Sequence, residues 1–549
     1  MRISPIKSNL YFKGATININ ALSDTHGKLP LADRAYQTLV NKKNDCFEKE
    51  EKGKINYLIL GGDWFISGGK KGFLSSPDKP LMKFQSQVLN KFISEIKEKY
   101  PKTKTIFVPG NHDFDGGVDL FMDTMKETEA EIIFSNLDFN NSPKALDTIK
   151  EGKFVDSKID FVSDDKNNDK EYAILNLGIA PINMSYYQSD LEGLNLIDNI
   201  NIAQKFIQPE QYEKTQNIVS DKIKEFKEKY PDGVVILTCH TGVNFADKCA
   251  ENIQDINLIL NGHEHKSGVR FVNNTPIIEM SQNFKKVINA KIQINDNGSV
   301  DKIFIDGKDP LEDEYSDGEI GKFYKNLFSN DLKPTYTLSV KNSGTQELSI
   351  NNVRNKNSYL ANFVVDAILD SINKKDETVQ IFALNASSIR NGFRVGEKPT
   401  ITPFNVSNCL NGINYNQGEI YISEVNGLEL SQMVLDNFLF NQIDTEKNPL
   451  IHYAGLKINK SDLMEAYDSG KSDEELCKYV ILKETNEPIK PDKTYKIANP
   501  EKFFIKSTDD KIKELKKASY PLDLNVHDAF SDYFKRNPVS EIELENRLY

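Results

Sequence analysis

The sequence lacks several features that would assign it to a specialised class of protein. Its five cysteines are odd in number and form no repeated spacing, which argues against a disulfide-stabilised scaffold. No segment approaches the roughly 18 apolar residues of a membrane-spanning helix. The net charge of −12 argues against a general nucleic-acid binder, because such proteins present basic surfaces. We therefore expect neither a membrane nor a nucleic acid as a partner.

The N-terminal segment also lacks the apolar core of a secretory signal. Its most apolar part, residues 15–22, is interrupted by Asn18 and Asn20 and is better interpreted as a strand. We expect a cytoplasmic protein, or a chain that begins after a removed signal, and Met1 favours the first.

The first half of the chain alternates two kinds of segment. Amphipathic stretches of helical spacing lie between several apolar runs, which end at Leu22, Leu60, Val108, Leu237 and Leu260. This alternation predicts a layered α/β domain.

A chain of 549 residues exceeds what one hydrophobic core organises, so two or more domains are expected. An acidic segment and a possible helix precede Pro334, which breaks the pattern. We predict a tail at 1–14, the first domain at 15–308, a linker helix within 309–333 and a second domain at 334–549.

Histidine is scarce, yet five of the seven histidines fall in short polar pieces that follow apolar runs. The pieces are Ser23-Asp24-Thr25-His26-Gly27, Gly61-Gly62-Asp63, Gly110-Asn111-His112-Asp113, Thr238-Cys239-His240 and Gly262-His263-Glu264-His265. Each comes at the C-terminal end of a predicted strand, where open α/β sheets present catalytic groups. One such histidine alone would more often be a hydrogen-bonded structural residue, but five pieces in this order favour a metal site.

The spacing within these pieces suits shared metal ligands. Asp24 and His26 are two residues apart at a strand end, so their side chains point the same way, as do those of His263 and His265. Asp63 follows two glycines that permit a tight turn, and its carboxylate can bridge two ions.

The donor set contains nitrogen and oxygen but no thiolate. Asn111 offers an amide oxygen and His240 an imidazole nitrogen, whereas strand alternation turns Cys239 to the opposite face. Such a set suits Zn²⁺, Mn²⁺, Fe or Co²⁺ better than Ca²⁺ or Mg²⁺. Two ions about 3.5–4 Å apart can clamp the attacking and leaving oxygens of a phosphoryl transfer.

Taken in this order, the five pieces resemble the calcineurin-like metallophosphoesterase superfamily. The segment Gly110-Asn111-His112-Asp113-Phe114-Asp115 is similar to the Asn-His-Glu-Phe-Asp element of the 5′-nucleotidase family, with Asp113 in place of Glu. The resemblance covers roughly residues 15–300. It implies an α/β (α+β) fold: a four-layer metallophosphoesterase β-sandwich flanked by helices, with a second α/β substrate-binding domain.

The resemblance also implies a role for each residue. One ion would be held by Asp24, His26, Asp63 and His265, and the second by Asp63, Asn111, His240 and His263. His112 would stabilise the phosphoryl oxygens of the transition state or assist the leaving group. Asp115 would hold its imidazole in position.

In this family the C-terminal domain binds the organic part of the substrate, and its motifs are altered here. The segment from Asn385 to Arg390 resembles Asn-x-Gly-x-Ile-Arg, so both residues would contact substrate; a surface or ion-paired arginine is the other interpretation of Arg390. Phe504 would stack on a base, although a core phenylalanine fits equally well, and Asp510 would bind a ribose hydroxyl. Trp64, the single tryptophan, would either line the cleft or pack against the sheet.

We therefore predict a phosphoester hydrolase with two divalent metal ions and a small phosphorylated substrate. A 5′-nucleotidase acting on nucleoside monophosphates is the leading hypothesis. The altered second domain leaves open a cyclic nucleotide, a nucleotide sugar or another phosphoester. A non-catalytic binding protein on the same fold is the third interpretation.

Overall fold

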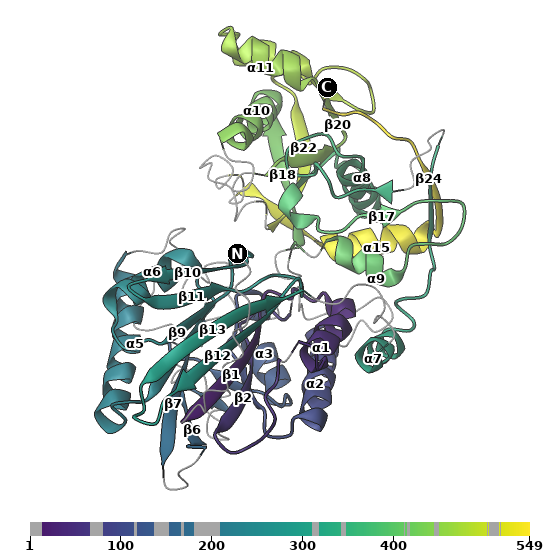
Figure 1. The fold of residues 1–549 in the computed structure, drawn as a ribbon. Coiled ribbons are helices and arrows are strands. Elements are labelled where there is room, and N and C mark those ends of the chain that lie inside the picture. The colour runs from purple at the N-terminus through teal and green to yellow at the C-terminus, as the bar shows by residue number, and fades with distance from the viewer. Residues whose placement is uncertain are drawn as a thin grey trace. The chain divides into compact units, whose positions relative to one another are not determined.

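The computed structural model divides the chain into two compact units (Figure 1). It describes residues 14–44, 46–65, 81–114, 118–136, 153–165, 170–180, 209–309, 318–341, 347–410, 412–413, 418–443, 449–501, 503, 515 and 518–548. Of the described residues, the first unit contains those within 14–65 and 82–327, and the second contains Leu81 and those from Phe328 onward. The division falls inside the segment predicted as a linker, whose acidic part, 310–317, lies outside the described residues, as does most of the predicted tail. Within the ranges just given, no helix is both long enough and apolar enough to cross a bilayer.

Two facing sheets form the centre of the described part of the first unit. The larger has the strand order β13-β12-β1-β2-β3-β4-β5, and the smaller has β10-β11-β9-β8-β7-β6. The larger sheet consists of β1 (Ala15–Leu22), β2 (Lys54–Leu60), β3 (Lys104–Phe107), β4 (Glu131–Ile133), β5 (Phe154–Val155), β12 (Val287–Ile294) and β13 (Val300–Lys308). The smaller consists of β6 (Lys158–Ser163), β7 (Glu171–Ile179), β8 (Val234–Cys239), β9 (Leu258–Asn261), β10 (Gly268–Val272) and β11 (Thr275–Glu279).

Helices cover the outer faces of these sheets. They are α1 (Ala32–Val40), α2 (Leu81–Lys99), α3 (Val118–Met125), α5 (Pro209–Lys229) and α6 (Val243–Asn252), with short 3-10 turns η1 (Leu29–Leu31) and η2 (His112–Phe114). The helix α7 (Glu319–Leu327) packs against α1 and η1. Residues of α5 and α6 share a buried apolar cluster with the smaller sheet, while α1 and α2 lie on the opposite side of the sandwich (Figure 1). The predicted order of helix, sheet, sheet and helix is therefore confirmed.

Alternating side chains of a strand point to opposite faces of its sheet, so one strand contributes to two layers of packing. Ile17 and Ile19 of β1 lie in the core between the sheets. Their neighbours Asn18 and Asn20 point to the other face, where both side chains donate to the carbonyl of Cys46. Period-two alternation of this kind is what a strand between two layers requires.

The topology gathers the polar pieces at one edge. β1, β2 and β3 pair in parallel, as do β7, β8 and β9 of the facing sheet. Parallel strands end at the same edge, so the segments after β1, β2, β3, β8 and β9 lie together. The strand ends lie within two residues of the positions predicted from the apolar runs.

The second unit is built on a sheet of order β19-β16-β22-β18-β23 in its described residues. These strands are β16 (Ile381–Asn385), β18 (Glu419–Asn426), β19 (Ile451–Ala454), β22 (Thr494–Pro500) and β23 (Tyr520–Asn525). Phe382 and Leu384 pack toward α8 (Tyr359–Asn373) and α15 (Val526–Arg536), whereas Ile381 and Ala383 pack toward α10 (Gly427–Ile443). The smaller elements are β14 (Thr337–Val340), β15 (Glu347–Leu348), η4 (Ala386–Ser388), β17 (Phe393–Arg394), α9 (Pro403–Cys409), β20 (Leu456–Ile458), α11 (Lys460–Asp468), α12 (Asp473–Leu476), η6 (Cys477–Tyr479), β21 (Val480–Leu482) and β24 (Val539–Ile542).

Candidate metal centre and active site

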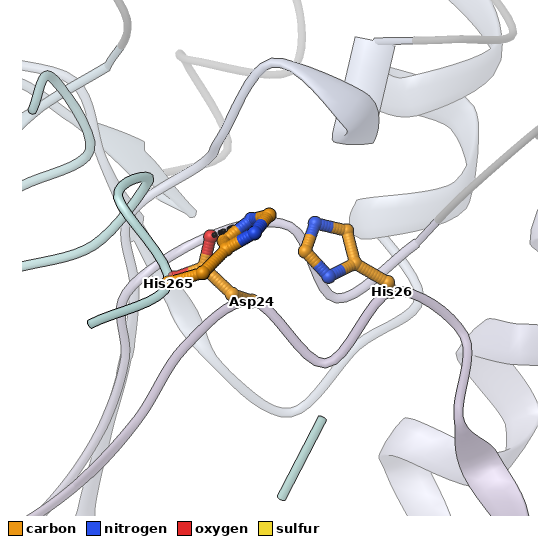
Figure 2. A group of neighbouring side chains, drawn as sticks. All are labelled: Asp24, His26 and His265. Carbon is orange, nitrogen blue, oxygen red and sulfur yellow. Dashed lines mark ion pairs between the residues drawn. The ribbon is translucent and has the colours of Figure 1, made fainter. Parts of the chain in front are cut away.

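The strand ends of both sheets bring the predicted ligands together. Three groups of ligand atoms each lie within 4.8 Å of one another: Asp24, His26 and His265; His26, Asp63 and His112; and Asp24, Asp63 and His240. Figure 2 shows the first group, in which the carboxylate of Asp24 is paired with the ring of His265 and the ring of His26 lies opposite.

The carboxylate of Asp63 joins the two sheets at this site. Its Oδ2 lies 3.3 Å from Nε2 of His26, which follows β1, and 3.2 Å from Nε2 of His240, which follows β8. Oδ1 of Asp24 lies 3.3 Å from Nε2 of His265 and 3.7 Å from Nε2 of His240. A carboxylate shared by imidazoles from opposite sheets has the placement that a bridging ligand needs.

The remaining predicted groups lie at the same place. Nδ1 of His263 is 3.1 Å from Oδ1 of Asn111. The ring of His112 is 5.5 Å, centroid to centroid, from the ring of His26. The backbone N–H of His112 donates to Oδ1 of Asp63 at 2.8 Å. The seven predicted ligands and the predicted catalytic histidine thus converge.

Most of these ligands have a backbone conformation that side chains rarely adopt. The φ angles are +51° at Asp24, +47° at His26, +53° at Asp63, +85° at His263 and +58° at His265. Such left-handed residues are strained, and they persist only where the surrounding structure holds them. Here the N–H of Asp24 donates to the carbonyl of Gly62, and that of His26 to the carbonyl of Asp63, both at 2.9 Å.

Two glycines allow the chain segments to approach closely. A Cβ at Gly62, where φ is +92°, would lie 2.5 Å from the backbone nitrogen of Gly110. A Cβ at Gly110 would lie 2.2 Å from Oδ1 of Asp63. Either side chain would displace a ligand, so the predicted need for glycine beside Asp63 has a steric basis.

The electrostatics of the site favour a cation. Burial opposes a charge on His240, but the carboxylates of Asp63 and Asp24 raise its pKa to about 10. Burial also lowers the pKa of His26. Nδ1 of His240 lies 2.7 Å from the carbonyl of Gly61, so Nε2 is the nitrogen that faces the carboxylates. That Nε2 is fully buried and makes no well-aligned hydrogen bond.

The residues therefore fit divalent metal ions. Buried carboxylates beside an imidazole nitrogen without a well-aligned hydrogen bond form a set that transition metals satisfy. Asp24, His26, Asp63 and His265 would hold one ion, and Asp63, Asn111, His240 and His263 the other.

Asp113 has a role that the sequence did not reveal. Its side chain is fully buried. Oδ2 accepts from the backbone N–H groups of Asp63 at 2.8 Å and Gly110 at 2.7 Å, and Oδ1 accepts from that of Phe65 at 3.0 Å. Burial and the charge of Asp63 raise the pKa of this carboxyl to about 7. The only sequence signal was its place in the Asn-His-Asp element.

The structure resolves two residues for which the sequence allowed alternatives. Trp64 is 1% exposed and packs against Phe92 and Phe284, so it belongs to the core rather than the cleft. Cys239 is buried in the cluster shared with α5 and α6, on the face away from the carboxylates, as strand alternation predicted.

The predicted substrate residues belong to the second unit. Oδ1 of Asn385 accepts from the backbone N–H of Ser387 at 2.9 Å and caps η4. Arg390 is exposed, and its backbone N–H donates to the carbonyl of Cys409. Phe504 and Asp510 lie outside the described residues, as does Asp115, the predicted partner of His112.

Comparison with known proteins identifies the family of the first unit and the fold of the whole chain. The model of the calcineurin-like phosphoesterase family matches residues 17–267. No curated protein matches the chain in sequence. Among solved structures, a 5′-nucleotidase precursor from Thermus thermophilus has a TM-score of 0.64 at 16% identity, covering 97% of this chain and 99% of that one.

Two further structures share the whole fold. A putative 5′-nucleotidase from Staphylococcus aureus, in complex with alpha-ketoglutarate, has a TM-score of 0.57 at 13% identity, with 96% of this chain and 100% of that one covered. A sulfate thiohydrolase from Thermus thermophilus, in complex with glycerol, has a TM-score of 0.55 at 14% identity, with 100% and 97% covered. The N-terminal unit is therefore a calcineurin-like phosphoesterase domain, and the chain is a metal-dependent phosphoester hydrolase with the two-domain fold of the 5′-nucleotidases.

Proposed function

We propose that the protein is a 5′-nucleotidase that uses two metal ions to release phosphate from nucleoside monophosphates. The observation that carries the proposal is the position of Asp63, whose Oδ2 lies 3.3 Å from His26 and 3.2 Å from His240. A single carboxylate shared by two histidines from different sheets is suited to bridging two ions.

When bound, the two ions would supply hydroxide near neutral pH and stabilise charge on the phosphoryl oxygens. The residues of the chain orient this chemistry. His112 is fixed through its backbone N–H on Asp63, and its ring lies beside His26. In that place it can donate a hydrogen bond to a phosphoryl oxygen or a proton to the leaving oxygen. Hydrolysis breaks the phosphorus–oxygen ester bond, and the proton from water ends on the leaving oxygen.

The substrate class rests on a different argument. Two solved structures with this fold are described as 5′-nucleotidases, and the second unit keeps Asn385 and Arg390 in a segment of that type. A sulfate thiohydrolase shares the same fold, so the fold alone does not select the substrate. The altered motifs of the second unit favour, as a second candidate, a cyclic nucleotide, a nucleotide sugar or another phosphoester.

The decisive experiment measures phosphate release from the common nucleoside monophosphates in the presence of Mn²⁺, Zn²⁺ or Co²⁺. We expect turnover in the wild type and none in Asp63→Asn, which keeps the shape of the bridging residue but removes its charge. The same assay with cyclic nucleotides and nucleotide sugars tests the second candidate. A protein that binds metal but releases no phosphate from any nucleoside monophosphate is not a 5′-nucleotidase.

A further inference from the structure

The loop that carries His263 and His265 is held at both ends by one buried carboxylate. Glu279 is the last residue of β11 and is 6% exposed. The loop begins after Asn261, whose Nδ2 lies 3.0 Å from each carboxylate oxygen of Glu279. It ends at β10, from which Arg270 pairs with the same carboxylate through Nη1. The carboxylate therefore fixes the separation between the two strands that flank the loop.

Arg270 extends this contact to a second ligand-bearing segment. Its Nε donates to Oδ1 of Asp247 at 2.7 Å, and Asp247 lies on α6. That helix begins at Val243, three residues after His240. One guanidinium thus links the segment that follows His240 to the hairpin that follows His265. The planar fork of arginine can hold two carboxylates in fixed directions, whereas the single ammonium of lysine cannot.

This support matters because the ligands themselves are strained and open to solvent. His263 and His265 adopt left-handed backbone conformations, and both are exposed. The ring of His263 contacts Asn111 and that of His265 pairs with Asp24. Those contacts require the loop to place both rings correctly, which makes the anchoring of its two ends relevant to the site. Strained backbone conformations persist only where surrounding contacts determine them.

We propose that Glu279 and Arg270 are positioning residues, which hold His240, His263 and His265 in the geometry that binds metal. The inference rests on the two-metal site of the proposed function. It predicts that breaking this network weakens metal binding even where the fold survives. A network with a purely structural role would instead change the stability of the metal-free protein and leave metal affinity unaltered.

The test compares Glu279→Gln and Arg270→Lys with the wild type in the full-length protein, with Co²⁺ as the probe. Direct outer partners of metal ligands typically change metal affinity by about 10–100-fold. Glu279 and Arg270 act one contact further out, so we expect a loss of about 10-fold in both variants. We also expect a changed visible absorption spectrum of bound Co²⁺, since the spectrum reports ligand geometry. Thermal melting of the metal-free proteins measures any separate loss of stability. The matched control is Glu251→Gln on α6, the helix that carries Asp247. Glu251 pairs with Lys248 at 2.7 Å on the exposed surface.

The outcomes separate this inference from the proposed function. If the wild type binds no Co²⁺, the two-metal proposal fails. If the wild type binds Co²⁺ and both variants bind it with unchanged affinity and spectrum, only the positioning role is overturned. Should Glu279→Gln fail to fold, Arg270→Lys and Asp247→Asn provide the test. The side chain of Asp247 is 31% exposed, and changing it disturbs only its contact with Arg270. Weaker Co²⁺ binding in that pair supports the inference, and wild-type binding in both refutes it.

Discussion

Replacing Asp113 should have a large effect on stability, because one carboxylate satisfies three buried backbone N–H groups. The donors are Asp63, Gly110 and Phe65, at 2.7–3.0 Å. Each donor left without a partner costs about 1–3 kcal/mol, and water entering the vacated space recovers part of that. We expect Asp113→Ala to lower the free energy of unfolding by about 3–5 kcal/mol. Asp113→Asn should lose about 1.5–3 kcal/mol, because its amide oxygen can keep two donors while its NH₂ group faces the third.

Urea unfolding of the metal-free protein measures both losses. Asp123→Ala is the matched control, since the side chain of Asp123 on α3 is half exposed and pairs with Lys126, which is also about half exposed. We expect a change of less than about 0.5 kcal/mol in the control. A loss below about 1 kcal/mol in Asp113→Ala, with an unchanged slope in urea, would show that the three contacts do not support this turn.

Three further predictions address the histidines. His112→Asn should lower kcat for phosphate release by about 10²–10³-fold with unchanged metal content, and an unaltered kcat would remove His112 from the chemistry. His26→Gly and His26→Ala lose the same imidazole, but φ at this position is +47°, which favours glycine. Urea unfolding should therefore show the glycine variant to be more stable than the alanine variant by about 1 kcal/mol. The reverse order would mean that this backbone is not strained. His452 is buried, and burial lowers its pKa to about 4. Its imidazole therefore binds a proton more readily in the unfolded chain than in the folded one. Stability should fall by up to about 3 kcal/mol as pH drops from roughly 6.5 to 4, and His452→Gln should lose that dependence in denaturation at the two pH values.

The convergence of these aspartate and histidine side chains was predictable because its signals are local. An apolar run followed by Asp-x-His or Gly-His-x-His places side chains at a strand end, and parallel strands bring such ends together. The antiparallel pairings of β1 with β12 and of β12 with β13 were not predicted, because a partner as distant in sequence as Ile294 is from Ala15 leaves no local pattern. The left-handed backbone at the ligands also escaped prediction, since aspartate and histidine give no sign of the conformation that tertiary contacts impose.

Contacts that hold the ligands were harder to predict than the ligands themselves. Asp113 and Glu279 act through backbone N–H groups and an asparagine amide, and several residue types could serve those partners. A metal pair, in contrast, accepts few donors in few places, so the chemistry limits the residues that the sequence can contain. Recognition of a nucleoside resembles the supporting contacts of Asp113 and Glu279 in this respect. Its stacking surfaces and polar contacts can be supplied by different side chains from different loops.

The reaction type and the substrate of this enzyme differ in how far the sequence predicts them. In the second unit, Oδ1 of Asn385 caps η4, so the proposed contact with substrate would be made by its amide NH₂. Arg390 is an exposed residue whose backbone N–H donates to the carbonyl of Cys409. These groups can bind a phosphate, a sulfate or a ribose hydroxyl, and they do not distinguish between them. In the proposed function, reaction type is therefore determined by the strand ends of the first unit, whereas substrate choice depends on side chains whose chemistry is shared by several classes of ester.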